Sequence, residues 1–344
     1  MIESVKIRNF RGIKEGEINL APLTILLGAN NSGKTTILEA LFLAPNPFRQ
    51  VPYKSDKYNL AVEVVHIMHE TLESQGFVFL LNKYIAKTVE IECKVNGDRF
   101  LLKFIKNRDY IYVTTNKDIK HYSTAHVEGE EIKHFGYLYI SEFEIFPYDS
   151  MPFIDNTLLI SPKLIKLGYE YLEENWASII NLGICRKIAE DASRLSVDKY
   201  KDITLEPFLG KKLTIYAYLE DGTRIRLGDL GEGIQNYILS RILFEIVKPD
   251  ILLWDDVESH FNPRILLSIA EWFSDILDEG KQVIVSTHSL EAARTIASMN
   301  EEKARIYLTS LDNGILKVKE LTLEEVEGYL EAGIDVRVAE PMLL

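Results

Sequence analysis

The sequence predicts an α/β fold with two lobes, a mixed or antiparallel N-terminal sheet and a short helical insertion. Three observations support this prediction. A Gly-rich loop at 28–35 lies between an apolar strand and a helix, and a buried strand at 251–256 ends in two carboxylates. Between them, apolar residues recur at helical spacing in 157–200. The stretch from Lys34 to Asp255 is longer than a minimal domain needs, so a lobe and an insertion must separate the two motifs.

The loop from Gly28 to Thr35 matches the phosphate-binding pattern G-x-x-x-x-G-K-[ST] in its required strand–loop–helix context. Gly28 and Gly33 let the backbone curl so that its N–H groups point at a phosphate. Lys34 would contact the β- and γ-phosphates, and the Thr35 hydroxyl can ligate Mg²⁺. We therefore expect these residues to bind a nucleoside triphosphate: Asn30, Asn31, Ser32, Gly33, Lys34, Thr35 and Thr36.

Composition places the chain among ordinary globular proteins. Its 344 residues suffice for one large or two ordinary domains, and 47% are hydrophobic. No apolar run approaches the roughly 20 residues that span a bilayer, and the N-terminus does not resemble a signal peptide. The two cysteines, Cys93 and Cys185, exclude a disulfide framework and a CxxC zinc site. We expect a cytoplasmic protein without membrane contact.

The charge distribution points to one local candidate for an acidic partner. The net charge of −13 argues against general attraction to nucleic acid. Residues 76–125, however, carry an excess of lysine and arginine, and this region could contact DNA or RNA. Lysines that protect an edge strand from aggregation would give the same pattern, so both interpretations stay open.

The remaining elements follow from periodicity and turn residues. Alternating strands are expected at 4–10 and 17–20, a helix at 34–43, and a helix rather than a strand at 60–68. Antiparallel strands are expected within 76–114, another strand at 137–141, and hairpins at Asn96-Gly97, Asp221-Gly222 and Asn313-Gly314. We expect three units: an ATPase lobe I at 1–145, a helical insertion at 146–205 and an ATPase lobe II at 206–344.

Three later segments carry further candidate site residues. Gly231 and Gly233 precede an amphipathic helix, where they form either a second phosphate site or an ordinary capping turn. Asp255 would hold Mg²⁺, and Asp256 or Glu258 would orient the attacking water as the catalytic base. His288 ends the next buried strand, where a sensor of the γ-phosphate would be useful.

The order of these motifs resembles the ABC-type ATPase family, with a finer match to the soluble branch of SMC, RecF and OLD-type ATPases. Residues 7–12, I-R-N-F-R-G, resemble the opening strand of that branch. Residues 28–35 resemble its G-x-N-x-S-G-K-[ST] loop, and 286–289 its switch-histidine motif. Residues 254–263 resemble the D-E-P-E-x-H-L-H-P block of OLD-like and related stand-alone AAA-labelled ATPases.

This resemblance implies an ABC ATPase head-like fold with ATP and Mg²⁺ as cofactors. It also implies a homodimer in which each ATP lies between one chain's phosphate loop and the other chain's signature segment around Gly231 and Gly233. Arg11 would contact the phosphates. A loop after Ile140, near Ser141 and Glu142, would sense Mg²⁺ and the attacking water.

Departures from the family pattern qualify this expectation. Gly231 replaces a signature serine and Asp256 replaces a glutamate, and both changes predict slow turnover. The insertion is too short for SMC arms and lacks a zinc-hook CxxC. The chain also leaves no room for the Toprim nuclease domain of the OLD branch, so we expect that this chain is not the nuclease.

The predicted function is a slow ATP-hydrolysing switch. It would act on nucleic acid or on an effector protein from a neighbouring gene, in DNA repair or antiviral defence. One alternative is the nucleotide-binding subunit of a membrane ABC transporter, although the Asn9-Phe10-Arg11 start fits it poorly. Another is a nucleotide-binding scaffold with negligible hydrolysis, suggested by Gly231 and Asp256.

Overall fold

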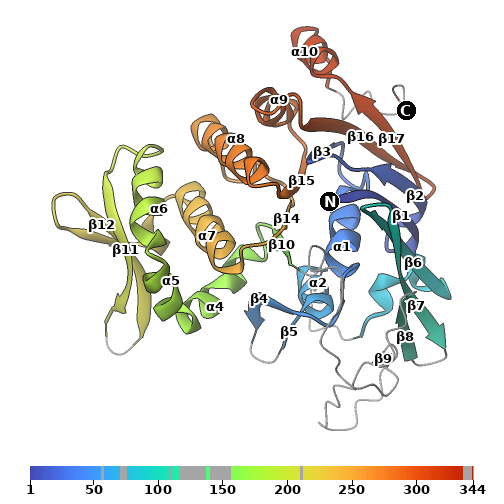
Figure 1. Ribbon diagram of the computed structural model, residues 1–344, viewed down its shortest axis with the longest axis horizontal. Helices are drawn as coiled ribbons and strands as arrows, with labels where there is room; N and C mark the ends of the chain where they lie inside the picture. The colour runs from blue at the N-terminus through green and yellow to red at the C-terminus, as the bar shows by residue number, and fades with distance from the viewer. Residues whose placement is uncertain are drawn as a thin grey trace.

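A mixed sheet of twelve described strands runs through the protein in the order β10-β14-β15-β3-β16-β17-β2-β1-β6-β7-β8-β9 (Figure 1). The computed structural model describes residues 1–55, 58–69, 76–107, 110–115, 137–139, 156–209, 212–335 and 343. The strands are β1 Ile2–Phe10, β2 Ile13–Asn19, β3 Leu23–Leu27, β6 Thr88–Val95, β7 Asp98–Asn107, β8 Tyr110–Thr115, β9 Tyr137–Tyr139, β10 Thr157–Ile160, β14 Ile251–Trp254, β15 Gln282–Thr287, β16 Ala304–Asp312 and β17 Ile315–Leu321.

One half of this sheet is parallel and the other is mainly antiparallel. Strands β10, β14, β15, β3 and β16 run parallel to one another, and every residue of β3, β10, β14 and β15 is buried. Such continuous burial is what a parallel strand needs when helices cover both of its faces. Strands β1, β2, β6, β7 and β8 pair antiparallel, which confirms the predicted mixed sheet.

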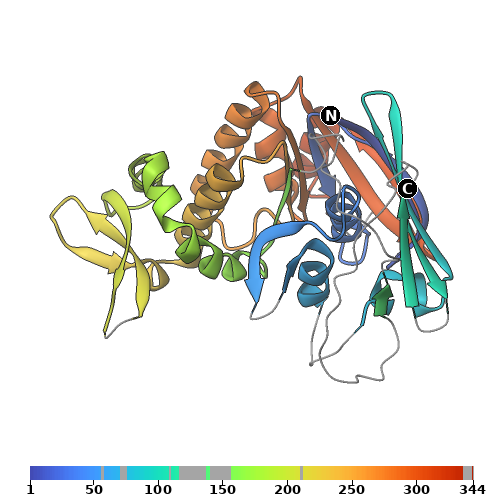
Figure 2. The same cartoon turned by 60° about the horizontal axis from the view of Figure 1, so that its bottom comes forward.

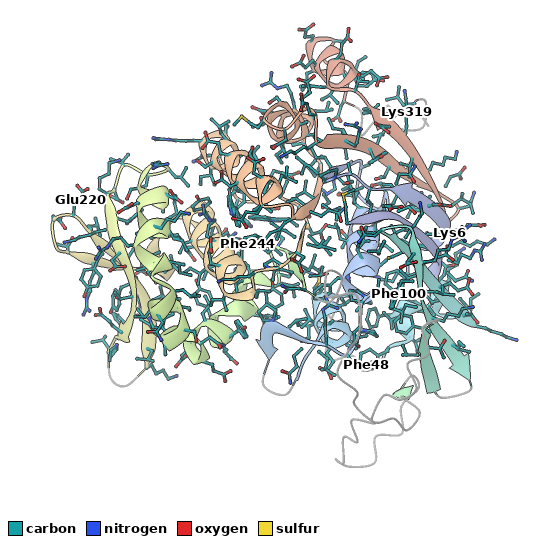
Figure 3. All side chains as sticks on the ribbon, viewed as in Figure 1. Lys6, Phe48, Phe100, Glu220, Phe244 and Lys319 are labelled. Atoms are coloured by element: carbon teal, nitrogen blue, oxygen red, sulfur yellow. The ribbon has the colours of Figure 1, made fainter. Side chains whose placement is uncertain are left out.

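Some of the described α-helices pack on the parallel strands, and the others pack on neighbouring helices or belong to a small unit at one end of the molecule. The helices are α1 Lys34–Leu43, α2 Ala61–His69, α4 Gly168–Glu174, α5 Trp176–Leu182, α6 Ile184–Ser193, α7 Glu232–Val247, α8 Pro263–Asp278, α9 Leu290–Ser298 and α10 Leu323–Glu331. The sequence supplies their caps: the Asn262 side chain accepts from Ile265 N before α8, and Ser289 accepts from Ala292 N before α9. Phe244 of α7, labelled in Figure 3, meets Trp272 of α8 edge to face, with 5.2 Å between ring centroids.

A small unit lies at the opposite end of the molecule from the N-terminal sheet, and both ribbon views show it (Figures 1 and 2). It contains α4 to α6 and a three-stranded sheet of β11 Tyr200–Pro207, β12 Leu213–Leu219 and β13 Arg224–Arg226. Glu220 marks its outer tip in Figure 3. Buried Arg241 of α7 joins this unit to the core, because its Nη2 lies 3.2 Å from Asp191 of α6.

The observed boundaries differ from the expected units in two ways. Strand β10 lies within 146–205, yet it pairs in parallel with β14 and so belongs to the large sheet. The helices of the expected insertion therefore begin only after β10. The small unit that contains them continues past residue 205 to the end of β13. Strands β16 and β17 lie within 206–344 but pair with β3 and β2, so one sheet serves both lobes.

The other elements are short. Strands β4 Gln50–Ser55 and β5 Tyr58–Leu60 form a separate hairpin next to α2. Four 3₁₀ turns complete the described chain: η1 Val78–Leu80, η2 Asn82–Tyr84, η3 Ile165–Leu167 and η4 Leu227–Asp229. The predicted helix at 34–43 and all three predicted hairpin turns are confirmed.

Cross-strand ion pairs cover the outer face of the N-terminal sheet, where Figure 3 marks Lys6. Within the described part of 76–125, Lys94 pairs with Glu3 at 2.6 Å, Lys103 with Glu90 at 2.6 Å and Arg99 with Glu92 at 3.4 Å. Of these three carboxylates only Glu3 lies outside 76–125, so most of the basic excess of that segment is unchanged. The proposed contact with nucleic acid stays a prediction.

Candidate nucleotide site

The predicted motifs meet at one edge of the sheet. Strand β15 lies between β14 and β3, and all three run in parallel. Their carboxyl ends therefore lie side by side, and each is followed by one motif: the phosphate loop after β3, the acidic pair after β14 and His288 after β15. This edge is where ligands bind in open α/β sheets.

Lys34 lies inside the curled phosphate loop and is almost fully buried. Its Nζ donates to Gly28 O at 2.9 Å and to Ala29 O at 2.8 Å. Gly28 cannot be replaced without movement, because a Cβ there would lie 2.5 Å from Thr309 O. Gly33 has φ 94°, a left-handed conformation that favours glycine.

Thr309 contacts this loop from another strand, and the sequence did not reveal this contact. Its Oγ1 lies 3.1 Å from Ser32 Oγ and donates to Leu27 O at 3.3 Å. Thr309 comes from β16, so the sheet register alone brings it under the loop.

A cation site is prepared beside the loop. The Thr35 hydroxyl lies 3.0 Å from both carboxylate oxygens of Asp255, and Ser286 Oγ donates to Asp255 Oδ1 at 2.6 Å. Ser286 Oγ also accepts from Asp256 N at 2.8 Å, which fixes the turn after β14. Burial, followed by the negative charge of Asp256, raises the pKa of Asp255 to about 7.

The hydroxyl and carboxylate oxygens of Thr35 and Asp255 suit a hard cation such as Mg²⁺. Among the described residues, no group of three or more His, Cys, Asp or Glu could hold a metal alone. A magnesium ion here would therefore share its ligands with phosphate and water, as this cation usually does.

Three candidate catalytic groups surround His288. Its Nε2 lies 3.0 Å from Asp256 Oδ1, and its Nδ1 lies 3.0 Å from Gly28 O and 3.2 Å from Lys34 Nζ. Glu258 Oε1 instead accepts from His288 N at 2.6 Å. The other oxygen, Oε2, is buried and has no hydrogen bond within the described residues. Asp256 is thus directed to the imidazole, whereas Glu258 holds the backbone of the turn.

Arg11 contacts α1 one turn beyond the phosphate loop. Its guanidinium pairs with Glu39, a fully buried residue one turn after Thr35, and its Nη2 lies 3.0 Å from His69 Nδ1. The backbone holds it as well, since Asn82 Nδ2 donates to Arg11 O at 2.6 Å. Contact with phosphate stays a prediction, and Glu39 and His69 are neighbours that the sequence did not reveal.

A cavity of about 860 Å³ opens beside Arg11. Polar and aromatic side chains line it, among them Arg11, His66, His69, Phe79, Asn82 and Asn313. The side chain of Leu311 lies within 3.5 Å of the Cβ positions of both Gly12 and Gly33. Only the Leu311 side chain therefore separates the cavity wall at Gly12 from the phosphate loop at Gly33.

The signature segment lies apart from this network. Gly231 is the N-cap of α7 and makes no side-chain cap, and a Cβ there would meet nothing within 4 Å. A Cβ on Gly233 would lie 2.6 Å from His260 O. No hydrogen bond within the described chain joins either glycine to the phosphate loop of the same copy. Ser141 and Glu142 lie outside the described residues.

None of the described helices is both long and apolar enough to cross a membrane.

Comparison with known proteins adds the family. Residues 1–152 match the family described as "AAA ATPase domain". A segment of 122 residues is 30% identical to "Uncharacterized protein MJECL10" of Methanocaldococcus jannaschii. That match covers 34% of this chain and 51% of the relative, so it spans about half of the relative's length.

Solved structures of SMC heads share the fold. A head bound to the C-winged helix domain of ScpA has TM-score 0.53 and 14% identity, with 95% of this chain and 99% of that chain covered. A head with an extended coiled coil, bound to the C-terminal domain of ScpA from Pyrococcus furiosus, has TM-score 0.52, 15% identity and coverage of 96% and 98%.

A second family match covers more than half of the chain, residues 101–293. The protein therefore belongs to the family described as "AAA domain, putative AbiEii toxin, Type IV TA system", and it is an ABC/SMC-like AAA ATPase in fold.

Proposed function

We propose that this protein is a slow ATP-hydrolysing switch that dimerises around Mg²⁺–ATP. One observation carries the proposal: Lys34, Asp256 and His288 converge at one sheet edge, beside the Thr35–Asp255 pair. Phosphoryl transfer to water requires a cation that neutralises the phosphates, ligands for a metal ion and a group that orients the attacking water, and this edge supplies candidates for each.

Each residue has a distinct role in the proposed site. The phosphate loop and Lys34 bind the phosphates, and Thr35 and Asp255 hold Mg²⁺. Asp256 orients the attacking water, and its 3.0 Å contact with His288 Nε2 supports this choice of base. Glu258 acts as a positioning residue because it holds the His288 backbone N–H at 2.6 Å.

The cavity beside Arg11 suits the adenosine part of the nucleotide. Phe79 and two histidines offer surfaces for stacking, and Arg11 also lines the cavity. Because Glu39 is fully buried, Arg11 also offsets a carboxylate that would otherwise repel the nucleotide. Contact between Arg11 and the phosphates would require the guanidinium to share these partners.

The N-terminus of α7 suits a phosphate held by a second copy. Gly231 leaves this helix end exposed and without a side-chain cap, so its backbone N–H groups and the helix dipole are open to an anion. An ATP sandwich between two copies would use this surface. It also explains why the α7 end makes no hydrogen bond to the phosphate loop of its own chain.

The test is nucleotide-dependent dimerisation. In sedimentation velocity, the Asp256→Asn variant should form a dimer with Mg²⁺–ATP and remain a monomer with Mg²⁺–ADP. The Lys34→Ala variant should bind no nucleotide and stay monomeric. A wild-type ATP hydrolysis rate that Lys34→Ala leaves unchanged would show that this site is not the ATPase.

A scaffold with negligible hydrolysis is the second candidate, because the α7 end lacks a hydroxyl at Gly231 and Asp256 is a short base. Single-turnover hydrolysis separates the two functions. A switch releases phosphate from bound ATP, and the rate should fall in Asp256→Asn. A scaffold keeps ATP intact in both proteins.

We further propose an effector protein as the target in the reducing cytoplasm. The ion pairs at Lys94, Arg99 and Lys103 leave less free positive charge for nucleic acid, and both described cysteines are free thiols. DNA repair and antiviral defence remain the proposed settings. ATPase assays with and without single- and double-stranded DNA, at stated salt, test the nucleic-acid alternative.

A further inference from the structure

Glu39 is a buried carboxylate to which the proposed chemistry gives no part of its own. It lies on α1, one turn after the phosphate loop, and has no exposed surface. The Arg11 guanidinium and Nε2 of His69 both contact its carboxylate. Removing one partner of a buried ion pair is strongly unfavourable, because it leaves a charge without compensation. Arg11 therefore cannot turn from Glu39 to a phosphate unless another group offsets that carboxylate.

His69 lies where it can supply the missing positive charge. It is the last residue of α2, a helix end that favours a cation, and its side chain is 31% exposed. Arg11 Nη1 lies against His69 Nε2, and Nη2 lies 3.0 Å from Nδ1. Arginine has no acceptor, so Nδ1 must be unprotonated to accept from it. His69 is thus neutral while the guanidinium stays, because a second positive charge there would be repelled.

The surroundings of His69 favour an anion. Besides Arg11 and Glu39, the ring faces Phe79 of η1, with 6.5 Å between ring centroids, and Lys163 Nζ donates to the carbonyl of the preceding residue at 2.7 Å. Arg11 and His69 line the same cavity, and the other described titratable side chains along it are His66, Lys83 and Tyr84. Among the described residues that line this cavity there is no carboxylate. A bound phosphate would therefore meet only neutral and positively charged side chains.

We propose that His69 is a positioning residue that takes up a proton when Arg11 turns from Glu39 to the nucleotide phosphates. The protonated imidazole replaces the guanidinium as the positive partner of Glu39, so Arg11 can bind phosphate without leaving a buried charge unpaired. The proton comes from solvent when the nucleotide binds and returns to solvent when the nucleotide leaves. This inference rests on the proposed nucleotide site.

The test counts the protons taken up when nucleotide binds. Isothermal titration calorimetry with Mg²⁺–ADP is run at about pH 7, where histidine can change its charge, in buffers of different ionisation enthalpy. The slope of the observed enthalpy against the buffer enthalpy gives the proton uptake. Burial raises the pKa of Asp255 to about 7, so this residue releases a proton when Mg²⁺ binds. All variants keep Asp255, and comparison with the wild type cancels this release.

His69→Gln separates proton uptake from simple hydrogen bonding. Glutamine keeps a donor for Glu39 and an acceptor for Arg11, but it cannot take up a proton. The wild type should take up about 0.5–1 proton more per bound ADP than this variant. Its affinity advantage should grow as the pH falls from about 8 to 6, by at most about tenfold per pH unit.

Two further variants locate the proton. Arg11→Gln should also lose the extra uptake, because Glu39 then draws the proton to His69 before the nucleotide arrives. This variant keeps the test decisive if His69→Gln does not unfold cooperatively in urea. His66→Gln changes another histidine of the same helix and cavity, and it should keep the wild-type proton uptake.

Wild-type proton uptake in His69→Gln or in Arg11→Gln would overturn the inference, as would loss of the uptake in His66→Gln alone. These results all require that ADP binds. Absence of Mg²⁺–ADP binding to the wild type, or binding that Lys34→Ala leaves unchanged, would instead overturn the proposed function.

Discussion

The two halves of the proposed nucleotide site are built differently. The phosphate-loop half is finished inside one chain: Lys34 is 4% exposed, Asp255 is 6% exposed, and hydrogen bonds connect their surroundings. The α7 half is a surface. Gly231, Glu232 and His260 are exposed, and the helix end has no side-chain cap.

This difference indicates which half can act alone. A set of buried charges held in place by the fold can bind Mg²⁺–nucleotide with only local exchange of hydrogen-bond partners. The exposed half has helix dipole and hydrogen-bonding capacity but no ligand of its own. We therefore expect changes in the first half to abolish binding by the monomer, and changes in the second half to affect only assembly.

The largest effect is expected for Asp255→Asn. The variant removes a ligand of the proposed Mg²⁺, so stabilisation by Mg²⁺–ATP in thermal unfolding should be lost. Without nucleotide the same variant should be more stable than the wild type at neutral pH, because burial raises the pKa of Asp255 from 3.8 to about 7 in the folded protein. Below about pH 4 the carboxyl is protonated in both the folded and the unfolded wild type. As the pH rises to about 7, the unfolded chain loses this proton first, and the free energy of unfolding of the wild type falls.

The raised pKa of Asp255 also sets the size of this pH effect. The shift from 3.8 to about 7 corresponds to up to about 4 kcal/mol in the free energy of unfolding. In urea denaturation without nucleotide, Asp255→Asn should become more stable than the wild type as the pH rises from about 4 to 7. A difference that stays constant with pH would show that Asp255 is an ordinary carboxylate.

Asp256→Asn and Glu258→Gln should separate chemistry from positioning. Asp256→Asn should slow single-turnover hydrolysis by about 10²-fold or more, in the range of general base catalysis, while the ATP dimer persists. Glu258→Gln keeps an oxygen acceptor for His288 N, so we expect a loss of less than about tenfold. The opposite ranking would make Glu258 the base.

Gly233→Ala and Gly231→Ala probe the exposed half with the same added methyl group. At Gly233 the Cβ would meet His260 O at 2.6 Å, and overpacking should cost about 1–3 kcal/mol of stability and weaken the dimer. At Gly231 the Cβ meets nothing within 4 Å, so stability should change by less than about 0.5 kcal/mol. Equal effects on urea denaturation would contradict the close contact.

Sequence reasoning found the parts of the site that follow from chain order. The loop at 28–35, the acidic pair and His288 each follow a buried strand, and parallel strands bring their carboxyl ends together. The sequence did not predict contacts that depend on how distant strands and loops pair in the fold. Thr309 reaches the loop only because β16 lies next to β3, and the Arg11–Glu39 pair joins residues 28 positions apart in the chain.

The missed strand has a similar cause. Residues 157–160, T-L-L-I, are all buried and too few to show a period, so the run cannot be told from part of a helix. Its pairing with β14 depends on residues far away in the chain. Strands β16 and β17 likewise pair with strands far away in the chain, β3 and β2.

The smallest effect is expected for Gly231→Ser, which restores the hydroxyl at the open helix end. A serine N-cap can accept a hydrogen bond from a backbone N–H of α7, which should stabilise the protein by a few tenths of a kcal/mol. In an ATP dimer the same hydroxyl could instead contact the partner's nucleotide, and ATP-dependent dimerisation should then tighten a few-fold. Gly228→Ser is the control, because its Cβ also meets nothing within 4 Å. Greater stability in urea without a tighter dimer would mean that the hydroxyl only caps α7. That outcome would remove the α7 end from the nucleotide site and leave the phosphate-loop half as the whole of it.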